Sequence, residues 1–180
     1  RDQFPQFPNA RGAITTATRR LNQLLRSPVL QCILANNESA INFREVMDNG
    51  KILLINIPIG ELGAVNSYIL GSLIISKIHA AALTRQDTPS EQRKPFYLYV
   101  DEFQHILCQS IEECLTGTRK YALGLILAHN SLGQISARDK DVSDAVLEVP
   151  NTRVCFQVGD SDSVTLAKGF SHYSPEELKN

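Results

Sequence analysis

The sequence lacks an excess of charge of either sign. Its 180 residues include 18 lysines and arginines against 19 aspartates and glutamates, a formal net charge of -1 at pH 7. No overall field therefore points to a nucleic-acid partner. Glycine and proline, at 10 and 8 residues, are too few for a collagen-like or low-complexity chain. With 43% hydrophobic residues, the chain can build the core of one domain or of part of a larger one.

The charge is unevenly distributed along the chain. Residues 1–37 contain five arginines and one aspartate, a net charge of +4, so the remainder sums to -5. We expect residues 1–40 to form a basic helical segment and residues 41–180 to form an α/β region.

The sequence also lacks the patterns of several common sites. No G-x-S-x-G elbow is present, and no C-x-x-C pair or histidine at zinc-ligand spacing accompanies the cysteines. The cysteines lie among apolar neighbours, so we expect reduced core residues in a cytosolic setting: Cys32, Cys108, Cys114 and Cys155. No signal peptide is recognisable. The apolar stretch 62–83 is interrupted by polar residues, which favours a buried helix over a membrane span.

Hydrophobic periodicity predicts helices and strands in alternation. The expected helices cover 11–26, 28–34, 62–84, 111–121, 131–135, 142–147 and 161–170. One more helix is expected to end at Asp48, with Ser39 or Asn42 as its N-cap. The expected strands are 51–58, 96–100, 123–128 and 152–158, and residues 86–95 read as a polar loop. Continuous apolar strands between helices predict an α/β fold with a parallel, doubly wound sheet.

Two adjacent acids follow one of these strands. The apolar run Phe96–Val100 leads directly into Asp101 and Glu102, at the strand end where open α/β sheets bind ligands. This is the Walker B pattern of P-loop NTPases, in which Asp101 would hold a magnesium ion and Glu102 would polarise the attacking water. The alternative is a pair of solvated acids that begin a turn.

A phosphate-binding loop is missing from the sequence. No G-x-x-x-x-G-K-[ST] motif occurs, and the segment Ile59–Gly63 has glycines but no lysine or hydroxyl residue. The 180 residues therefore do not supply a complete nucleotide site. Either residues upstream in a parent protein complete the site, or this piece does not hydrolyse nucleotide.

Six phrases, in order and at consistent spacing, carry a family resemblance. They are Ile41–Pro58, Leu70–Ile74, Pro95–Gln104, Thr118–Leu125, Ala128–Gln134 and Asn151–Asp160. Over about residues 20–170 the chain resembles the later half of the motor domain of conjugative coupling proteins of the TraD/TraG type, which are related to HerA- and FtsK-like DNA pumps.

The resemblance implies a RecA-like P-loop NTPase fold, with a mainly parallel sheet between helices and without its Walker A part. It implies an ATP-dependent, DNA-translocating motor with ATP and Mg2+ as cofactors, assembled as a hexamer around single-stranded or duplex DNA. Relaxosome or secretion-channel proteins would be its partners in type IV secretion. The expected location is the cytoplasmic side of a bacterial inner membrane. Attachment to that membrane is left open for the parent protein, although no membrane segment is expected in this chain.

The resemblance also assigns roles to site residues. Asp101 and Glu102 would contact ATP, with Asp101 as metal ligand. The tip of the strand ending at Ala128 would sense the γ-phosphate through Asn130, where the family usually has glutamine. His129 or Gln134 are possible substitutes for that role.

Two arginines match candidates for a finger that faces a neighbouring subunit's phosphate. Arg119 is the stronger candidate, and its alternative is a surface arginine paired with Glu112 or Glu113. Arg153 is the weaker candidate.

Two other functions stay open. One is a non-catalytic DNA- or protein-binding module derived from such an ATPase, which the missing phosphate loop and the basic start favour. The other is a metal-dependent hydrolase using Asp101 and Glu102, with His105 nearby. His79 and His105 are otherwise expected to be structural. On the first reading, the isolated chain is inactive and its full-length parent is a DNA-dependent ATPase.

Overall fold

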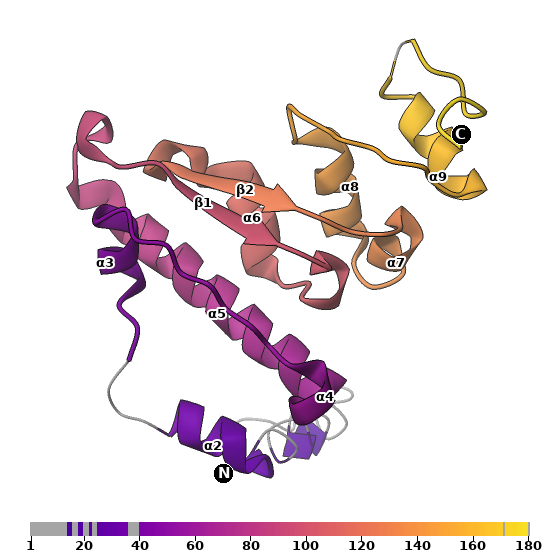
Figure 1. Cartoon of the computed structure of the whole chain (residues 1–180). Coiled ribbons are helices and arrows are strands. Elements are labelled where there is room, and N and C mark those ends of the chain that lie inside the picture. The colour runs from indigo at the N-terminus through magenta and orange to yellow at the C-terminus, as the bar shows by residue number, and fades with distance from the viewer. Residues whose placement is uncertain are drawn as a thin grey trace, which may run out of the picture. The chain divides into compact units, whose positions relative to one another are not determined.

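The computed structural model describes residues 14–15, 18–19, 22, 25–35, 40–170 and 172–179. It is a mixed α/β structure, mostly helical, with a small two-stranded parallel sheet among the helices (Figure 1). The chain divides into two compact units, one of residues 1–41 with 56–67 and one of residues 42–55 with 68–180. We describe each unit by itself.

The first unit is helical where it is described near its start. Helix α2 (Pro28–Leu34) confirms the prediction for 28–34, with proline in its first turn and the Ser27 hydroxyl accepting from the Leu30 amide at 3.4 Å. The predicted helix 11–26 lies partly outside the described residues, and those that are described include helical residues on either side of Arg19. Helix α4 (Ile59–Leu62) ends at Gly63, whose φ of 76° favours glycine.

The sheet of the second unit consists of β1 (Phe96–Val100) and β2 (Leu123–Leu127). The strands are parallel, with Phe96 opposite Leu123 and Val100 opposite Leu127, and Figure 1 shows both arrows pointing the same way. Both strands confirm sequence predictions. A parallel pair needs a crossover connection, which here runs through helix α6 (Gln109–Gly117).

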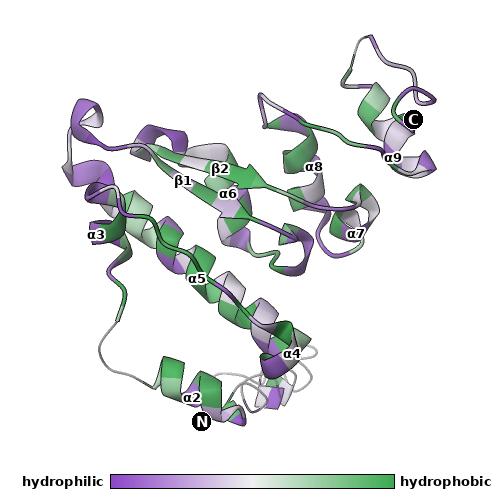
Figure 2. Cartoon of the chain, viewed as in Figure 1, coloured by the Kyte–Doolittle hydropathy of each residue, from purple (hydrophilic) through white to green (hydrophobic). Residues whose placement is uncertain are grey.

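The other two predicted strands are wrong. Residues 51–58 and 152–158 are in no strand and pair with neither β1 nor β2. Several of their apolar side chains are exposed, with Ile52 91%, Leu54 90% and Phe156 85% exposed, although Figure 2 shows the run between α3 and α4 as largely hydrophobic. An apolar run becomes a strand only when a neighbour supplies ladder hydrogen bonds, and neither run has such a neighbour here. The doubly wound sheet is thus reduced to two strands.

The two faces of the sheet differ. One face packs into the core, where Leu98 and Leu125 contact buried residues of helix α5 (Ala64–Thr84) and α6, including Ile75, Ile78 and Cys114. The other face is open and carries Tyr97 and Tyr99, which are 59% and 73% exposed, and Ile126 at 38%. A Cβ at Gly124 would lie 2.7 Å from the ring of Tyr97. Glycine there therefore lets the tyrosine ring lie across β2.

Helix α5 buries one stripe of its surface. The buried positions recur at helical spacing: Ser67, Gly71, Ile75, Ile78, His79 and Ala82. The prediction of a buried helix is wrong for the opposite side, where Val65 and Leu73 are 48% and 41% exposed. Apolar residues occur on both sides, so composition alone could not locate the packed face. By length and mean hydropathy, the 24 residues of Ala64–Asp87 could also cross a membrane, but their inward side carries His79 and Arg85, as in a core helix.

The remaining helices follow the predictions closely. They are α3 (Phe43–Asp48), α7 (Leu132–Ser136), α8 (Lys140–Glu148) and α9 (Asp160–Ala167). The Asn42 side chain caps α3 by accepting from the Glu45 amide at 3.1 Å, which confirms one of the two predicted caps. The predicted helix 111–121 instead stops at Gly117, where the Thr118 hydroxyl donates to the Cys114 carbonyl at 2.7 Å. The 3-10 turns are η1 (Arg85–Asp87), η2 (Ser90–Gln92), η3 (Phe103–His105) and η4 (Arg119–Tyr121).

A buried arginine fixes the amino ends of both strands. The Arg85 side chain is fully buried and donates to the carbonyls of Lys94 at 2.6 Å and Tyr121 at 2.9 Å, and to the Asp48 carboxylate at 3.1 Å. These acceptors lie just before β1, just before β2 and in α3. The strand starts are therefore tied together, and the opposite, carboxyl ends are left to form a site.

The cysteines are all free, and three of the four are at least partly buried as predicted. Burial raises the pKa of the Cys114 thiol to about 12, with the Cys108 and Glu113 charges adding to the effect. The prediction is wrong for Cys32, which is exposed on α2, because the apolar residues beside it in sequence lie on other faces of that short helix.

Candidate functional site at the carboxyl ends of the strands

The candidate site lies at the carboxyl ends of β1 and β2. The ladder continues one step beyond the strands, because the Ala128 amide donates to the Val100 carbonyl at 3.0 Å and the Phe103 amide donates to the Ala128 carbonyl at 3.1 Å. Residues 101–102 and 129–130 therefore leave the sheet at the same edge. This is the edge at which open α/β sheets place their ligands.

Glu102 is the centre of this edge. Its Oε1 accepts a hydrogen bond from Asn130 Nδ2 at 2.7 Å, which joins residues 28 positions apart in the sequence. Its Oε2 accepts from the side-chain amide of Gln104, and His105 Nε2 lies 4.0 Å from the same oxygen. The side chain is 48% exposed. It is thus held in place by neutral donors and still open to solvent.

The backbone of Glu102 is unusual. Its φ of 50° and ψ of 40° place it in the left-handed region, which costs a residue other than glycine about 1–2 kcal/mol. The chain then turns at once into η3. Such conformations persist where surrounding contacts hold them, so the Glu102 carboxylate is aimed by its backbone as well as by its hydrogen bonds.

Asp101 lies beside Glu102 and is exposed. Its Oδ1 accepts from the backbone amide of Glu102 at 3.0 Å. No group of three or more His, Cys, Asp or Glu side chains suited to a metal lies in the described part of the chain. Mg2+, however, is usually held by one or two carboxylates together with substrate phosphates and water, so an exposed Asp101 fits that ion.

His129 packs inward from the same edge. Its ring stands edge-on to Phe103, with centroids 5.5 Å apart at 88°, and its Nδ1 is buried without a hydrogen-bond partner in the described part of the chain. Burial lowers the pKa of His129, and the Asp162 carboxylate opposes that shift. The structure therefore brings Asn130, and not His129, to Glu102.

The other predicted site residues lie apart from this cluster. Gln134 is exposed on α7, and no hydrogen bond joins it to Glu102 or Asn130. Arg119 lies in η4, before the amino end of β2, and a strand of five residues spans roughly 16 Å. Arg119 therefore cannot reach the Glu102 end of its own sheet.

Of the alternative role for Arg119, the exposed position is found and the pairing with a glutamate is not. Arg119 forms no ion pair with Glu112 or Glu113 among the described residues; Glu113 Oε2 instead lies 3.3 Å from His79 Nδ1. Arg153 turns inward and donates to the Leu147 carbonyl, so its guanidinium is not presented to a neighbour.

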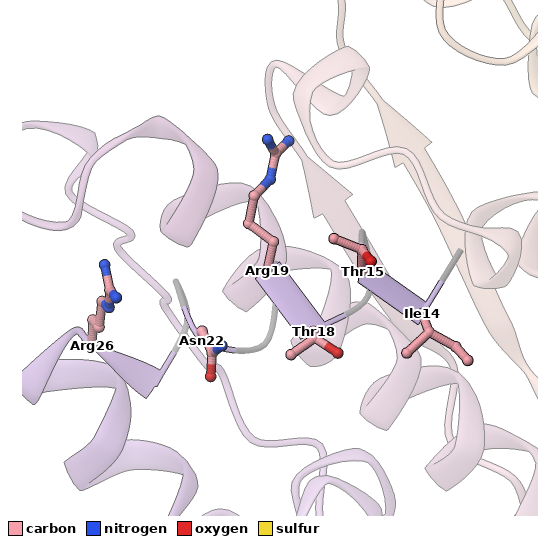
Figure 3. Close-up of a pocket in the computed structure, with 6 residues that line it drawn as sticks. All are labelled: Ile14, Thr15, Thr18, Arg19, Asn22 and Arg26. Carbon is pink, nitrogen blue, oxygen red and sulfur yellow. The ribbon is translucent and has the colours of Figure 1, made fainter. Parts of the chain in front are cut away.

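A separate hollow lies in the basic segment. Its volume is about 620 Å³. Figure 3 labels the six residues that line it: Ile14, Thr15, Thr18, Arg19, Asn22 and Arg26. The described residues that line it are largely exposed. It offers two cationic side chains, but it belongs to the first unit and shares no residue with the Glu102 cluster.

The residues that hold Glu102 include some that sequence reasoning missed. Gln104 is 1% exposed, and its position two residues after Glu102 was a usable signal, because the turn brings it back to the carboxylate. Arg138 and Tyr68 contact the same turn, and no sequence pattern marks them.

No protein-family model, curated protein or solved structure matches this chain.

Proposed function

We propose that the chain is the later part of the motor domain of an ATP-dependent DNA translocase, of the kind found in conjugative coupling proteins. Asp101 and Glu102 are its Walker B acids, and Asn130 is the polar group at the tip of the adjacent strand. The finer fold proposed is RecA-like, with further parallel strands beside β1 and β2.

One observation carries the proposal. The Glu102 carboxylate and the Asn130 amide come from two parallel strands, meet at 2.7 Å and lie at one sheet edge. A base for phosphoryl transfer to water needs a carboxylate held at such an edge and open to solvent. Two solvated acids that merely begin a turn would not require a partner from a second strand.

The roles of the residues follow from their chemistry. When bound, Mg2+ neutralises charge on the phosphates of ATP. Asp101 would hold the ion through its exposed carboxylate, and Glu102 would orient and deprotonate the attacking water. Asn130 donates one hydrogen bond to Glu102, and its amide would donate to a phosphate oxygen in place of that carboxylate when ATP is bound, because both acceptors are anionic.

The proposed partners are DNA and further copies of the chain. Arg119 lies at the sheet end opposite Glu102, so any contact that it makes with phosphate would be with a site on a neighbouring subunit. This separation supports a ring, with a hexamer as the proposed form, on the cytoplasmic side of a bacterial inner membrane.

The test uses the full-length gene product. Steady-state ATP hydrolysis with Mg2+ and DNA is measured for the wild type, for Glu102→Gln and for Glu148→Gln, which changes an exposed acid away from the site. We expect Glu102→Gln to lower kcat by about 10²–10⁴-fold because it removes a general base, with ATP still bound and Glu148→Gln unaffected.

Absence of Mg2+- and DNA-dependent hydrolysis in the wild type would contradict the motor proposal. DNA binding that weakens steeply with salt in that same inactive protein would favour the non-catalytic binding module instead. Arg19 and Arg26, which line the hollow in Figure 3, are the residues to reverse in that case.

A further inference from the structure

An arginine from beyond β2 reaches the turn that follows β1. Arg138 Nη1 donates to the carbonyl of Gln104 at 3.0 Å and lies 3.4 Å from the carbonyl of His105. Its guanidinium lies over the ring of Tyr68 at 5.5 Å, and that ring stacks on His105 with centroids 5.0 Å apart at 4°. We call these contacts of Arg138 with Gln104, His105 and Tyr68 the Arg138 clamp.

The clamped residues are the ones that hold Glu102. The Gln104 side chain donates to Glu102 Oε2, and His105 Nε2 lies 4.0 Å from that oxygen. The same turn is closed by the His105 amide, which donates to the Glu102 carbonyl at 3.0 Å. Fixing the Gln104 and His105 carbonyls therefore fixes both the backbone and the side-chain partner of Glu102.

The turn needs such support because of the Glu102 backbone. A left-handed φ of 50° is unfavourable for glutamate, so the turn relaxes if its outer contacts are lost. One of those contacts is close packing against α5: a Cβ at Gly71 would lie 2.8 Å from Ile106 Cγ2. The Arg138 clamp supplies the second contact, on the side that faces α7 and α8.

Arg138 does not act as an ordinary surface arginine. It is exposed, but no carboxylate lies within ion-pair distance of it in the described part of the chain. Its neighbour Asp139 caps α8 by accepting from the Val142 amide at 3.1 Å, which anchors this backbone. A cationic donor on neutral carbonyls makes a stronger hydrogen bond than a neutral donor.

We propose that Arg138 is a positioning residue for Glu102, acting through the η3 turn. The expected effect of Arg138 on ATP hydrolysis rests on the proposed function. Its expected effect on the stability of the η3 turn rests on the contacts alone. Arg138 follows β2 and α7, while Glu102 follows β1, so the clamp joins the segments that follow the two strands.

The structural arm of the test is hydrogen exchange in the 180-residue chain. We expect Arg138→Ala to speed exchange of the His105 and Ile106 amides by about tenfold, because a hydrogen bond with a charged donor is lost. Lys140→Ala is the matched control, since Lys140 is an exposed cation two residues away. Unchanged exchange at these two amides in Arg138→Ala overturns the proposal.

The catalytic arm uses the full-length gene product. We expect Arg138→Ala to lower kcat for ATP about tenfold with KM within twofold and an unchanged Tm, and Arg138→Lys to restore part of the loss. Faster exchange with an unchanged kcat, in a protein that Glu102→Gln inactivates, overturns the positioning role. If exchange is faster in Arg138→Ala but the wild-type protein has no ATPase activity, the clamp is supported and the proposed function is overturned.

Discussion

At the scale of single residues, Glu102 is held without a lysine or arginine. Its two oxygens accept from the neutral side-chain amides of Asn130 and Gln104, and hydrogen bonds to a charged group contribute about 1.5–3 kcal/mol each. A pair with arginine would cost more to break and would occupy the carboxylate permanently. Neutral donors let Glu102 be aimed and still exchange a partner for substrate or water.

His129 makes the stability of the site depend on pH. Because burial lowers its pKa in the folded chain below the ordinary value of 6.5, the folded state resists protonation and the unfolded state does not. The stabilising effect of the neutral ring is therefore complete above about pH 6.5 and is lost as pH falls below it.

We accordingly expect the free energy of unfolding to fall more steeply below pH 6.5 in the wild type than in His129→Gln, because glutamine at position 129 cannot be protonated in this range. Urea unfolding from pH 5 to pH 8 measures the two slopes. Equal slopes in the wild type and His129→Gln would show that burial of His129 is not the cause.

At the scale of elements, the strands that could be predicted are those with a partner inside the chain. The runs 96–100 and 123–127 pair with each other, so an apolar pattern and a strand coincide. The runs 51–58 and 152–158 have the same apolar pattern but no ladder partner. The apolar residues of a segment indicate that it tends to be buried. Whether the segment forms a strand depends on a neighbouring strand, which its own sequence does not identify.

The site shows the same limit. Asp101 and Glu102 could be found because two acids directly follow an apolar run, whereas Asn130 was predicted only through the family resemblance. The contributions of Arg138 and Tyr68 depend on where α5 and the α7–α8 junction pack. Side chains far apart in sequence carry no mark of that proximity.

Helix α5 gives a prediction about faces. Ile75 is 4% exposed and Leu73 is 41% exposed, although both are apolar and lie two residues apart. We expect Ile75→Ala to lower the free energy of unfolding by about 2–5 kcal/mol, because it leaves a cavity in the core. Leu73→Ala should cost less than about 1 kcal/mol.

Chemical unfolding measures the loss of free energy of unfolding in each variant. Unchanged helical circular dichroism in both variants shows that the fold is retained. Equal losses would mean that both faces of α5 are covered, as in a helix that is buried all round or surrounded by lipid.

At the scale of the whole molecule, the two-stranded sheet is covered on one face and exposed on the other. Parallel sheets are normally covered on both faces, yet here one face is open at Tyr97 and Tyr99. In the described part of the chain, residues 51–58 and 152–158 also form no ladder with β1 or β2. These features agree with each other, since a sheet with more strands and a second helical layer would use all of them.

Amide exchange tests this account of the whole fold. In the 180-residue chain we expect residues 52–57 and 153–157 to exchange at least about a hundredfold faster than the ladder amides of β1 and β2, because no hydrogen bond must open first. The Val158 amide is an internal control: it donates to the Leu178 carbonyl at 3.2 Å and should exchange more slowly than that of Phe156. In the full-length gene product, a RecA-like sheet would slow exchange in both runs toward the rates of β1 and β2. Equal and fast exchange of the two runs in both proteins would leave a two-stranded sheet as the complete one and would contradict the RecA-like fold.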